Sequence, residues 1–440
     1  MKSEQFIRWC DTVMVFCLCA AIYFVSISIA LLEIFSYIAL VFYFLKRTII
    51  MGVETRRGKI GWRRLSFLGK LRQFLRAYKP IENCLNRPIT VLLIFSFVSV
   101  LTSQYPAVSW KGFLGKPLAH AFLYFNFIEC FNSRERLKKF LTVFFASASV
   151  VSLSGLYQSF FGRDLIFGHI AYDGRISSSF RAHNDFGAYL ILVIPVLLSL
   201  TIFPWWEKKN ASDKTNGLGI FFENPKIKIW LFLLLSLTLY DVGLTFSRGA
   251  WLGLIVSLII FGARNRQILK ILALIFVCSF IFVLIAKDPR FIFKDLKEIF
   301  IDNGRIYYWK EATNIIQHYL IFGAGLNAYS LVGRDYKITW GGYPHNCYLQ
   351  MAAETGLVGL AAFIWMLIVL FRNSFKISDR MESFSLKIVL NGFLIGLLGF
   401  LIHSFFDTVL YSVQLSSLMW IYMGVIVAIP KIAQHQEKKV

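Results

Sequence analysis

The sequence predicts an all-α, polytopic integral membrane protein with about 12 transmembrane helices packed in one bundle. Of its 440 residues, 57% are hydrophobic and only 16% are charged, whereas a soluble domain carries roughly 25% charged residues. The hydrophobic residues fall in continuous blocks of about 18 or more, the length that crosses a bilayer as a helix. Because the blocks are continuous rather than alternating, the pattern predicts helices and excludes a β-barrel.

The hydrophobic blocks follow one another along a single predicted membrane domain, residues 1–440. Met1–Asp11 is short and basic and leads into an apolar run that continues to Leu45 without a small-residue cleavage site, so we expect uncleaved helices there. The predicted spans are 11–25, 27–45, 87–103, 109–131, 139–160, 184–204, 228–246, 250–263, 269–287, 346–371, 386–408 and 411–430.

The distribution of charge predicts the orientation of the chain. The net charge is +22, which in a membrane protein indicates positive-inside topology and contact with anionic lipid rather than nucleic acid. Residues 46–79 contain eleven Lys or Arg and one acidic residue, Glu54. We therefore expect residues 46–86 to form a basic cytoplasmic loop, partly an amphipathic helix on the inner leaflet. Alternation of sides then predicts that both termini are cytoplasmic.

Two long loops are predicted on the non-cytoplasmic side, residues 161–183 and 287–345. The second holds eight Lys/Arg and six Asp/Glu, so its charge is far less one-sided than that of residues 46–79. Loops of this length tend to be functional or disordered. Apolar residues recur at helical spacing over Gly304–Tyr319, which predicts a helix at the membrane interface or on top of the bundle.

Arg248 lies in the segment TFSRGAWLG, where the chain turns between two predicted spans on the outer side. The small neighbours Ser247 and Gly249 allow close approach by backbone or ligand. A guanidinium is always charged and binds phosphate oxygens in a bidentate manner, so Arg248 suits a phosphate ligand. An interfacial arginine that reaches toward lipid headgroups explains the same pattern, and both interpretations stay open.

Arg305 opens the predicted loop helix in the segment GRIYYW, which also contains Trp309. An arginine near a helix N-terminus is disfavoured by the helix dipole. That cost points to an anion beside it, although a solvated surface arginine is the alternative.

His345 lies in the segment YPHNCYL, directly before a long apolar helix. Helix N-termini favour oxyanions, and a histidine titrates near neutral pH, so His345 suits a general base that accepts a hydroxyl proton. The alternative is that Asn346 is a plain N-cap and His345 is incidental. Tyr343 lies two residues before the histidine.

Further polar residues lie at the predicted outer ends of spans. His403 and Asp407 are four residues apart, which predicts one helix face and favours a structural polar pair over a proton relay. Arg181, His183 and Asn184 form a polar entry to the sixth span. The sequence holds no phosphate-binding GxxxxGK[ST], no HExxH and no outer DxD pair, so we expect no metal and no cofactor. The seven cysteines show neither metal spacing nor a paired framework.

Three segments together carry a family resemblance: TFSRGAWLG, GRIYYWKEATNIIQHYLIFGAGLNAY and PHNCYLQMAAETGLVGLAAF. In this order they resemble the bacterial O-antigen ligase/polymerase family over residues 170–430. The first 170 residues are similar to that family in hydropathy and span number only.

The resemblance implies a C-type membrane glycosyltransferase of the bacterial inner membrane, with its active site facing the periplasm. It implies a donor glycan carried on undecaprenyl pyrophosphate and, as acceptor, lipid A–core (O-antigen ligase) or another lipid-linked glycan (polymerase). The family's functional arginines and histidine match Arg248, Arg305 and His345, the expected catalytic residues of a metal-independent, inverting transfer. Expected substrate contacts are Arg181, Asn184, Ser247, Asn346, Tyr343 and Trp309. A membrane transporter or flippase is the rival class, and a non-catalytic assembly protein is a third.

Overall fold

The computed structural model describes residues 2–56, 66, 69–70, 78, 80–202, 224–262, 303–334 and 342–437. This part of the chain is built almost entirely from helices, with two isolated β-bridges in the loop after α7 and no β-strand. Helices that satisfy their own backbone hydrogen bonds are what the apolar blocks require in lipid. The all-α membrane architecture is therefore confirmed.

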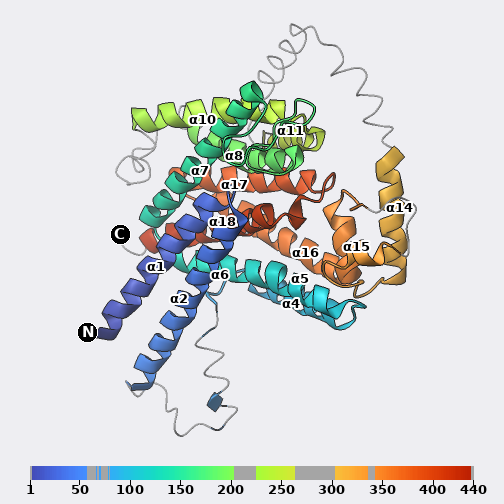
Figure 1. The fold of residues 1–440 in the computed structure, drawn as a ribbon. Coiled ribbons are helices and arrows are strands. Elements are labelled where there is room, and N and C mark those ends of the chain that lie inside the picture. The colour runs from blue at the N-terminus through green and yellow to red at the C-terminus, as the bar shows by residue number, and fades with distance from the viewer. Residues whose placement is uncertain are drawn as a thin grey trace.

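The helices follow in chain order and are labelled in Figure 1. They are α1 (Lys2–Phe24), α2 (Ile29–Arg56), α4 (Asn86–Leu101), α5 (Pro106–Phe113), η2 (Leu114–Leu118), α6 (Ala119–Cys130), α7 (Arg134–Phe161), α8 (His183–Ile202), α10 (Pro225–Leu244), α11 (Arg248–Gly262), α14 (Asn303–His318), α15 (Tyr329–Val332), α16 (Cys347–Arg380), α17 (Phe384–His403), η6 (Val409–Tyr411) and α18 (Val413–Glu437).

Eight of the described helices are long and apolar enough to cross a membrane, and α4 and α11 are shorter apolar helices. The predicted span 109–131 corresponds to α5, the π-helical turn η2 and α6, which follow one another without a break. The predicted span 269–287 lies outside the described residues. The count of about 12 spans therefore remains a prediction.

Two helices continue beyond the predicted membrane spans, because charged side chains do not end them. Helix α2 continues to Arg56, so the first part of the predicted loop 46–86 is helical. Lys46 Nζ lies 2.7 Å from Asp11 Oδ1 and 2.8 Å from Glu129 Oε1. A charge that is paired in this way can lie inside a helix packed against others. Helix α16 likewise runs on to Arg380, nine residues past the predicted end of its span.

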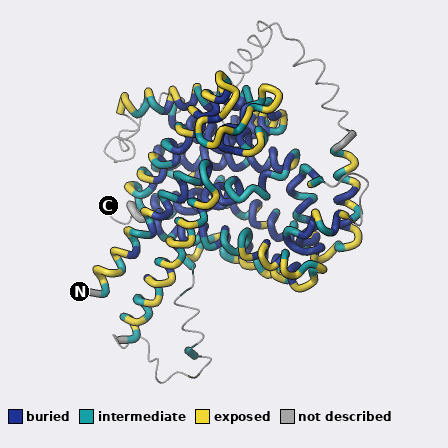
Figure 2. The backbone as a smooth tube through the Cα atoms, in the orientation of Figure 1, coloured by how far each residue is buried: buried dark blue, intermediate teal, exposed yellow. Residues whose placement is uncertain are grey.

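The centre of the bundle is formed by α8, α17 and α18, whose residues are mostly buried (Figure 2). Glycines bring helix backbones close together: a Cβ at Gly253 of α11 would lie 2.5 Å from the carbonyl oxygen of Gly399 in α17. A Cβ at Gly396 would lie 2.8 Å from the carbonyl oxygen of Leu192 in α8. Small residues at such contacts are how helices associate tightly in membranes. This packing fixes the N-terminal ends of α8 and α11 and the C-terminal end of α17 relative to one another.

Helices α14 and α15 cover one end of the bundle, opposite the side where α1 begins and α18 ends (Figure 1). The helix predicted over Gly304–Tyr319 is confirmed as α14, Asn303–His318. Its apolar face packs on α15 and α16 through Ala312, Ile315 and Ile316. This is the arrangement on top of the bundle that the apolar spacing allowed.

A break in α16 receives the chain that follows α14. Gly356 has a left-handed backbone (φ 71°) inside α16, and Leu357 N donates to Leu320 O at 2.9 Å. Ala324 N donates to Ala353 O, also at 2.9 Å. A Cβ at Gly356 would lie 2.0 Å from Ile321 O, so only glycine fits. The break in α16 therefore holds the segment that follows α14 against α16 through backbone hydrogen bonds.

Candidate functional site

His345 lies just before α16 with a left-handed backbone conformation (φ 47°). This conformation is unusual for a residue with a side chain and costs about 1 kcal/mol or more, so it persists where neighbours impose it. The next residue, Asn346, is the N-cap of α16 and accepts hydrogen bonds from Tyr348 N and Leu349 N at 3.0 and 3.1 Å. Asn346 is thus the N-cap that the sequence offered as an alternative. Its 1% exposure and occupied oxygen favour a structural role over substrate contact.

Asp407 joins His345 to α8. Its Oδ1 lies 3.1 Å from His345 Nδ1 and accepts a hydrogen bond from Thr408 N at 2.7 Å. Its Oδ2 accepts a hydrogen bond from Asn184 Nδ2, on the first turn of α8. One carboxylate therefore connects three segments that lie more than 60 residues apart in the chain.

The carboxylate of Asp407 is held in its ionised form. Burial opposes ionisation, but the hydrogen bond from His345, the neighbouring His403 and the Thr408 backbone N–H outweigh it and lower the pKa of Asp407 to about 2. An ionised carboxylate only accepts hydrogen bonds, so the Nδ1 atom of His345 carries the proton. In the neutral form of the ring, Nε2 then carries no proton and can act as a base. The His345 side chain is 44% exposed, which leaves it accessible to a ligand.

Arg248 is the first residue of α11 and is exposed. The turn before it is tight, since Phe246 has a left-handed backbone (φ 48°) and Thr245 N donates to Asp241 O at 3.0 Å. The residue after it, Gly249, lies against the buried ring of His403, where a Cβ would be 2.6 Å from Nδ1. Arg248 is thereby fixed at the end of α17 that leads into Asp407.

Arg305 is half-buried on the first turn of α14 and interacts electrostatically with His403. Tyr308, one turn further on, has its ring centroid 5.9 Å from that of His345. Trp309 packs edge-on against Phe405 with centroids 5.7 Å apart. Helix α14 therefore brings an arginine and two aromatic side chains to the corner that holds His345 and Asp407.

Three other expected substrate contacts lie around this corner with different exposure. Ser247 is only 2% exposed, and its Cβ would be 3.2 Å from a Cβ at Gly187 of α8, which favours a packing role over substrate contact. Tyr343 is exposed and stacks on Tyr329 with centroids 6.2 Å apart. Arg181 is exposed in the loop before α8.

The sequence interpretation of His403 and Asp407 as one helix face was wrong. Helix α17 ends at His403, and Asp407 lies beyond it, before η6. The two side chains still influence each other, but the hydrogen-bonded partner of Asp407 is His345. The signal available in the sequence was an acid in an otherwise apolar segment; its partner could not be found, because 62 residues separate the two.

Four helices begin around this corner: α8 at His183, α11 at Arg248, α14 at Asn303 and α16 at Cys347. Helix N-termini favour negative charge, and arginines stand on two of them. A histidine whose Nδ1 lies 3.1 Å from a carboxylate oxygen lies among them. The arrangement can bind an oxyanion and take a proton from a hydroxyl group beside it. Within the described residues, no three His, Cys, Asp or Glu side chains gather as metal ligands.

Residues 230–364 match the model of a protein family described as O-antigen ligase. The match confirms the resemblance to the O-antigen ligase/polymerase family and contains Arg248, Arg305 and His345. Asn184 and Asp407 lie outside the matched residues. No curated protein matches the chain.

Proposed function

We propose that this chain, whose residues 230–364 match the O-antigen ligase family model, transfers a glycan from undecaprenyl pyrophosphate to a sugar hydroxyl on lipid A–core. The observation that carries the proposal is the hydrogen bond between His345 Nδ1 and Asp407 Oδ1, which leaves Nε2 as a base among four helix N-termini. The family match supports an O-antigen ligase/polymerase-type glycosyltransferase. The acceptor, the undecaprenyl carrier and a site facing the periplasm of a bacterial inner membrane are parts of the proposal.

In the proposed reaction, Nε2 of His345 takes the proton of the acceptor hydroxyl as its oxygen attacks the anomeric carbon of the donor. The bond from that carbon to the pyrophosphate oxygen breaks, and the carrier leaves as undecaprenyl pyrophosphate. Arg248 and Arg305 neutralise the charge that grows on the leaving group. Asp407 stabilises the imidazolium that forms, as the carboxylate does in a catalytic triad. Attack opposite the leaving group inverts the anomeric centre.

The break in α16 bears on the transporter alternative. Discontinuous helices in transporters leave backbone groups that line a substrate path. Here the break is occupied by the chain's own backbone, with Leu357 N bonded to Leu320 O and Gly325 N bonded to Glu354 O. The break therefore supports a structural joint, and the proposal is a transferase.

The test is glycan transfer by the full-length protein in proteoliposomes that contain the lipid-linked donor and lipid A–core. We expect product on lipid A–core and, with donor alone, no lengthening of the lipid-linked chain. Lengthening without an acceptor would identify a polymerase, and solute flux with no glycan product would overturn the transferase proposal. In cells, loss of a ligase leaves unattached polymer beside bare lipid A–core, whereas loss of a polymerase leaves core with a single repeat unit.

A further inference from the structure

The loop between α7 and α8 exposes large apolar side chains that a loop in water would bury. Leu165, Phe167, Ile170 and Tyr172 are 66%, 53%, 67% and 77% exposed. Large exposed apolar side chains that are gathered in one short loop indicate an interaction site with protein or membrane.

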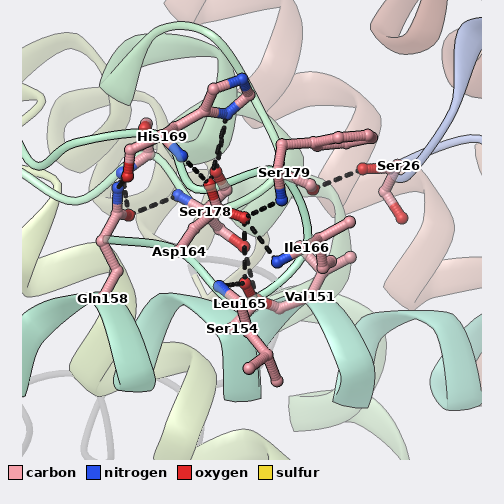
Figure 3. A network of polar contacts seen from close by, with 12 residues as sticks. Ser26, Val151, Ser154, Gln158, Asp164, Leu165, Ile166, His169, Ser178 and Ser179 are labelled. Atoms are coloured by element: carbon pink, nitrogen blue, oxygen red, sulfur yellow. Dashed lines mark hydrogen bonds and ion pairs between the residues drawn. The ribbon is translucent and has the colours of Figure 1, made fainter. Parts of the chain in front are cut away.

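The loop is held in shape by its own buried polar groups (Figure 3). The Asp164 carboxylate accepts hydrogen bonds from Ile166 N at 2.8 Å, from Phe167 N at 2.9 Å and from His169 N. Gln158 Oε1, at the end of α7, accepts from Ser177 N and Ser178 N at 2.8 and 2.7 Å. The apolar side chains cannot turn inward without breaking these buried bonds, each worth about 1–3 kcal/mol when its partner is lost. Their exposure is therefore built into the fold.

The exposed side chains of the loop continue the outer face of α7. Leu153, Tyr157, Phe160 and Phe161 are exposed at helical spacing on the last turns of that helix, and the rings of Tyr157 and Phe161 stack with centroids 4.4 Å apart. From Lys139 to Phe161 the helix rises about 33 Å, close to the roughly 30 Å of the hydrocarbon core. Helix α7 also runs obliquely to α8 and α17 (Figure 1), so we infer that, with Lys139 at the inner boundary of that core, its end does not pass the outer boundary. The loop that follows lies at the same level.

Basic side chains flank the apolar tip. Arg163 is exposed at the base of the hairpin, where it forms a β-bridge with Ile170. Arg175 is half-buried, with Nη1 3.4 Å from Nε2 of His183, the residue before Asn184. Aromatic side chains with arginines beside them are typical of the zone between acyl chains and phosphate headgroups.

We propose that residues 162–182 form a preformed membrane anchor whose tip, Leu165 to Tyr172, lies among the outer-leaflet acyl chains while Arg163 contacts lipid phosphate. The occupant of the apolar surface is phospholipid. The argument rests on continuity with the lipid-facing side of α7 and on the arginines, and it does not depend on the transfer reaction. The anchor would fix the depth in the membrane of the segment that precedes Asn184, a residue that bonds Asp407 in the candidate site.

The test is photocrosslinking of the full-length protein in vesicles of phosphatidylethanolamine and phosphatidylglycerol. Benzoylphenylalanine replaces Phe167, an exposed aromatic residue whose substitution leaves the buried bonds intact. The same probe at Leu252, exposed on α11, is the lipid-facing reference, and the probe at Ser330, exposed on α15, is the water-facing one. We expect phospholipid adducts at Phe167 at the level of Leu252 and at least several-fold above Ser330. A yield at the level of Ser330, or adducts with a second protein copy, overturns the proposal.

A second variant tests whether the anchor is preformed. Asp164→Asn removes the charge that organises the backbone N–H groups of the tip, so the adduct yield at Phe167 should fall while the yield at Leu252 stays the same. An unchanged yield at both positions would contradict a rigid anchor. Neither outcome bears on glycan transfer, which is measured separately.

Discussion

Two aspartates, Asp164 in the loop that follows α7 and Asp407 in the segment that follows α17, each lie beside a histidine. In the first, Asp164 Oδ2 lies 3.5 Å from His169 Nδ1, five residues along the chain, and the carboxylate is occupied by backbone N–H groups of its own loop. In the second, Asp407 Oδ1 lies 3.1 Å from His345 Nδ1, and the carboxylate bonds side chains from two other segments.

The two pairs differ in how far along the chain the partners of the carboxylate lie. Asp164 accepts hydrogen bonds from backbone N–H groups of its own loop, so its pair stabilises the local shape of that loop. Asp407 contacts His345, which has a left-handed backbone conformation, and Asn184 of α8, so its pair joins distant segments and, in the proposed function, positions a base. The residue types are the same, and the partners of the carboxylate decide the role. Paired substitutions at the two places test this comparison.

The largest expected effect is at the two histidines. His345→Ala removes the proposed base and should lower the rate of glycan transfer by about 10²–10⁴-fold, the usual contribution of general base catalysis. His169→Ala should stay within a few-fold of the unchanged protein. Both rates are measured in proteoliposomes at equal protein content; similar losses in the two variants would remove the distinction between the pairs.

The two carboxylates should separate activity from stability. Asp407→Asn keeps the shape but loses the charge that holds the ring and stabilises its protonated form, so transfer should fall by about 10²-fold or more. Asp164→Asn should leave transfer within a few-fold but lower the thermal midpoint, because buried N–H groups lose a partner at about 1–3 kcal/mol. Wild-type transfer by Asp407→Asn would refute the assigned role.

The rate of glycan transfer should depend on the shape of the arginine side chains at the helix N-termini as well as on their charge. Arg305→Lys keeps the charge but loses bidentate contact with phosphate oxygens, so we expect a loss of about 10–10²-fold, and Arg305→Ala a loss of about 10²–10³-fold. Arg334→Lys, exposed after α15, is the matched control and should have no effect. Equal rates for Arg305→Lys and Arg334→Lys would remove Arg305 from the site.

The stability of the folded protein at acid pH should depend on the ionised carboxylate of Asp407. Its pKa is lowered from 3.8 to about 2 in the folded state, so the ionised carboxylate contributes about 2 kcal/mol above pH 4 that is lost as the pH falls toward 2. The thermal midpoint of the unchanged protein should therefore fall more steeply from pH 5 to pH 3 than that of Asp407→Asn. Parallel curves would show that this carboxylate is not stabilised by its partners.

The smallest effect is expected at the helix cap beside the base. Asn346→Ala removes the acceptor for Tyr348 N and Leu349 N and should cost about 1 kcal/mol of stability, seen as a lower thermal midpoint. Asn346→Ser, which still caps a helix, should recover most of it. Failure of serine to recover the midpoint would point to a role for Asn346 beyond capping.

The sequence was sufficient where the physics is local. The apolar spacing over Gly304–Tyr319 predicted α14 to within one residue at each end, because helical periodicity and burial act within the segment. The positions of Arg248, Arg305 and His345 at helix starts followed for the same reason. One local arrangement was not predicted: Asp164 accepts hydrogen bonds from three backbone N–H groups within the next five residues.

Tertiary pairing was beyond the reach of the sequence. Asp407 was placed on the face of a helix that stops four residues earlier, and its bonds to His345 and Asn184 join segments that only the packed bundle brings together. The continuation of α2 past Lys46 depends in the same way on Asp11 and Glu129. Charges in a single sequence do not reveal the partners that make them tolerable in a membrane.

The central claim is that Nε2 of His345, held by Asp407, takes the proton of the acceptor hydroxyl. The most direct test is chemical rescue of His345→Gly, because glycine adopts the left-handed backbone at this position without strain and leaves space for a ring. Transfer by His345→Gly should fall by at least about 10²-fold and rise with added imidazole, while His345→Gly combined with Asp407→Asn should respond far less. Full activity of His345→Gly without imidazole would contradict the account, as would equal rescue with and without Asp407.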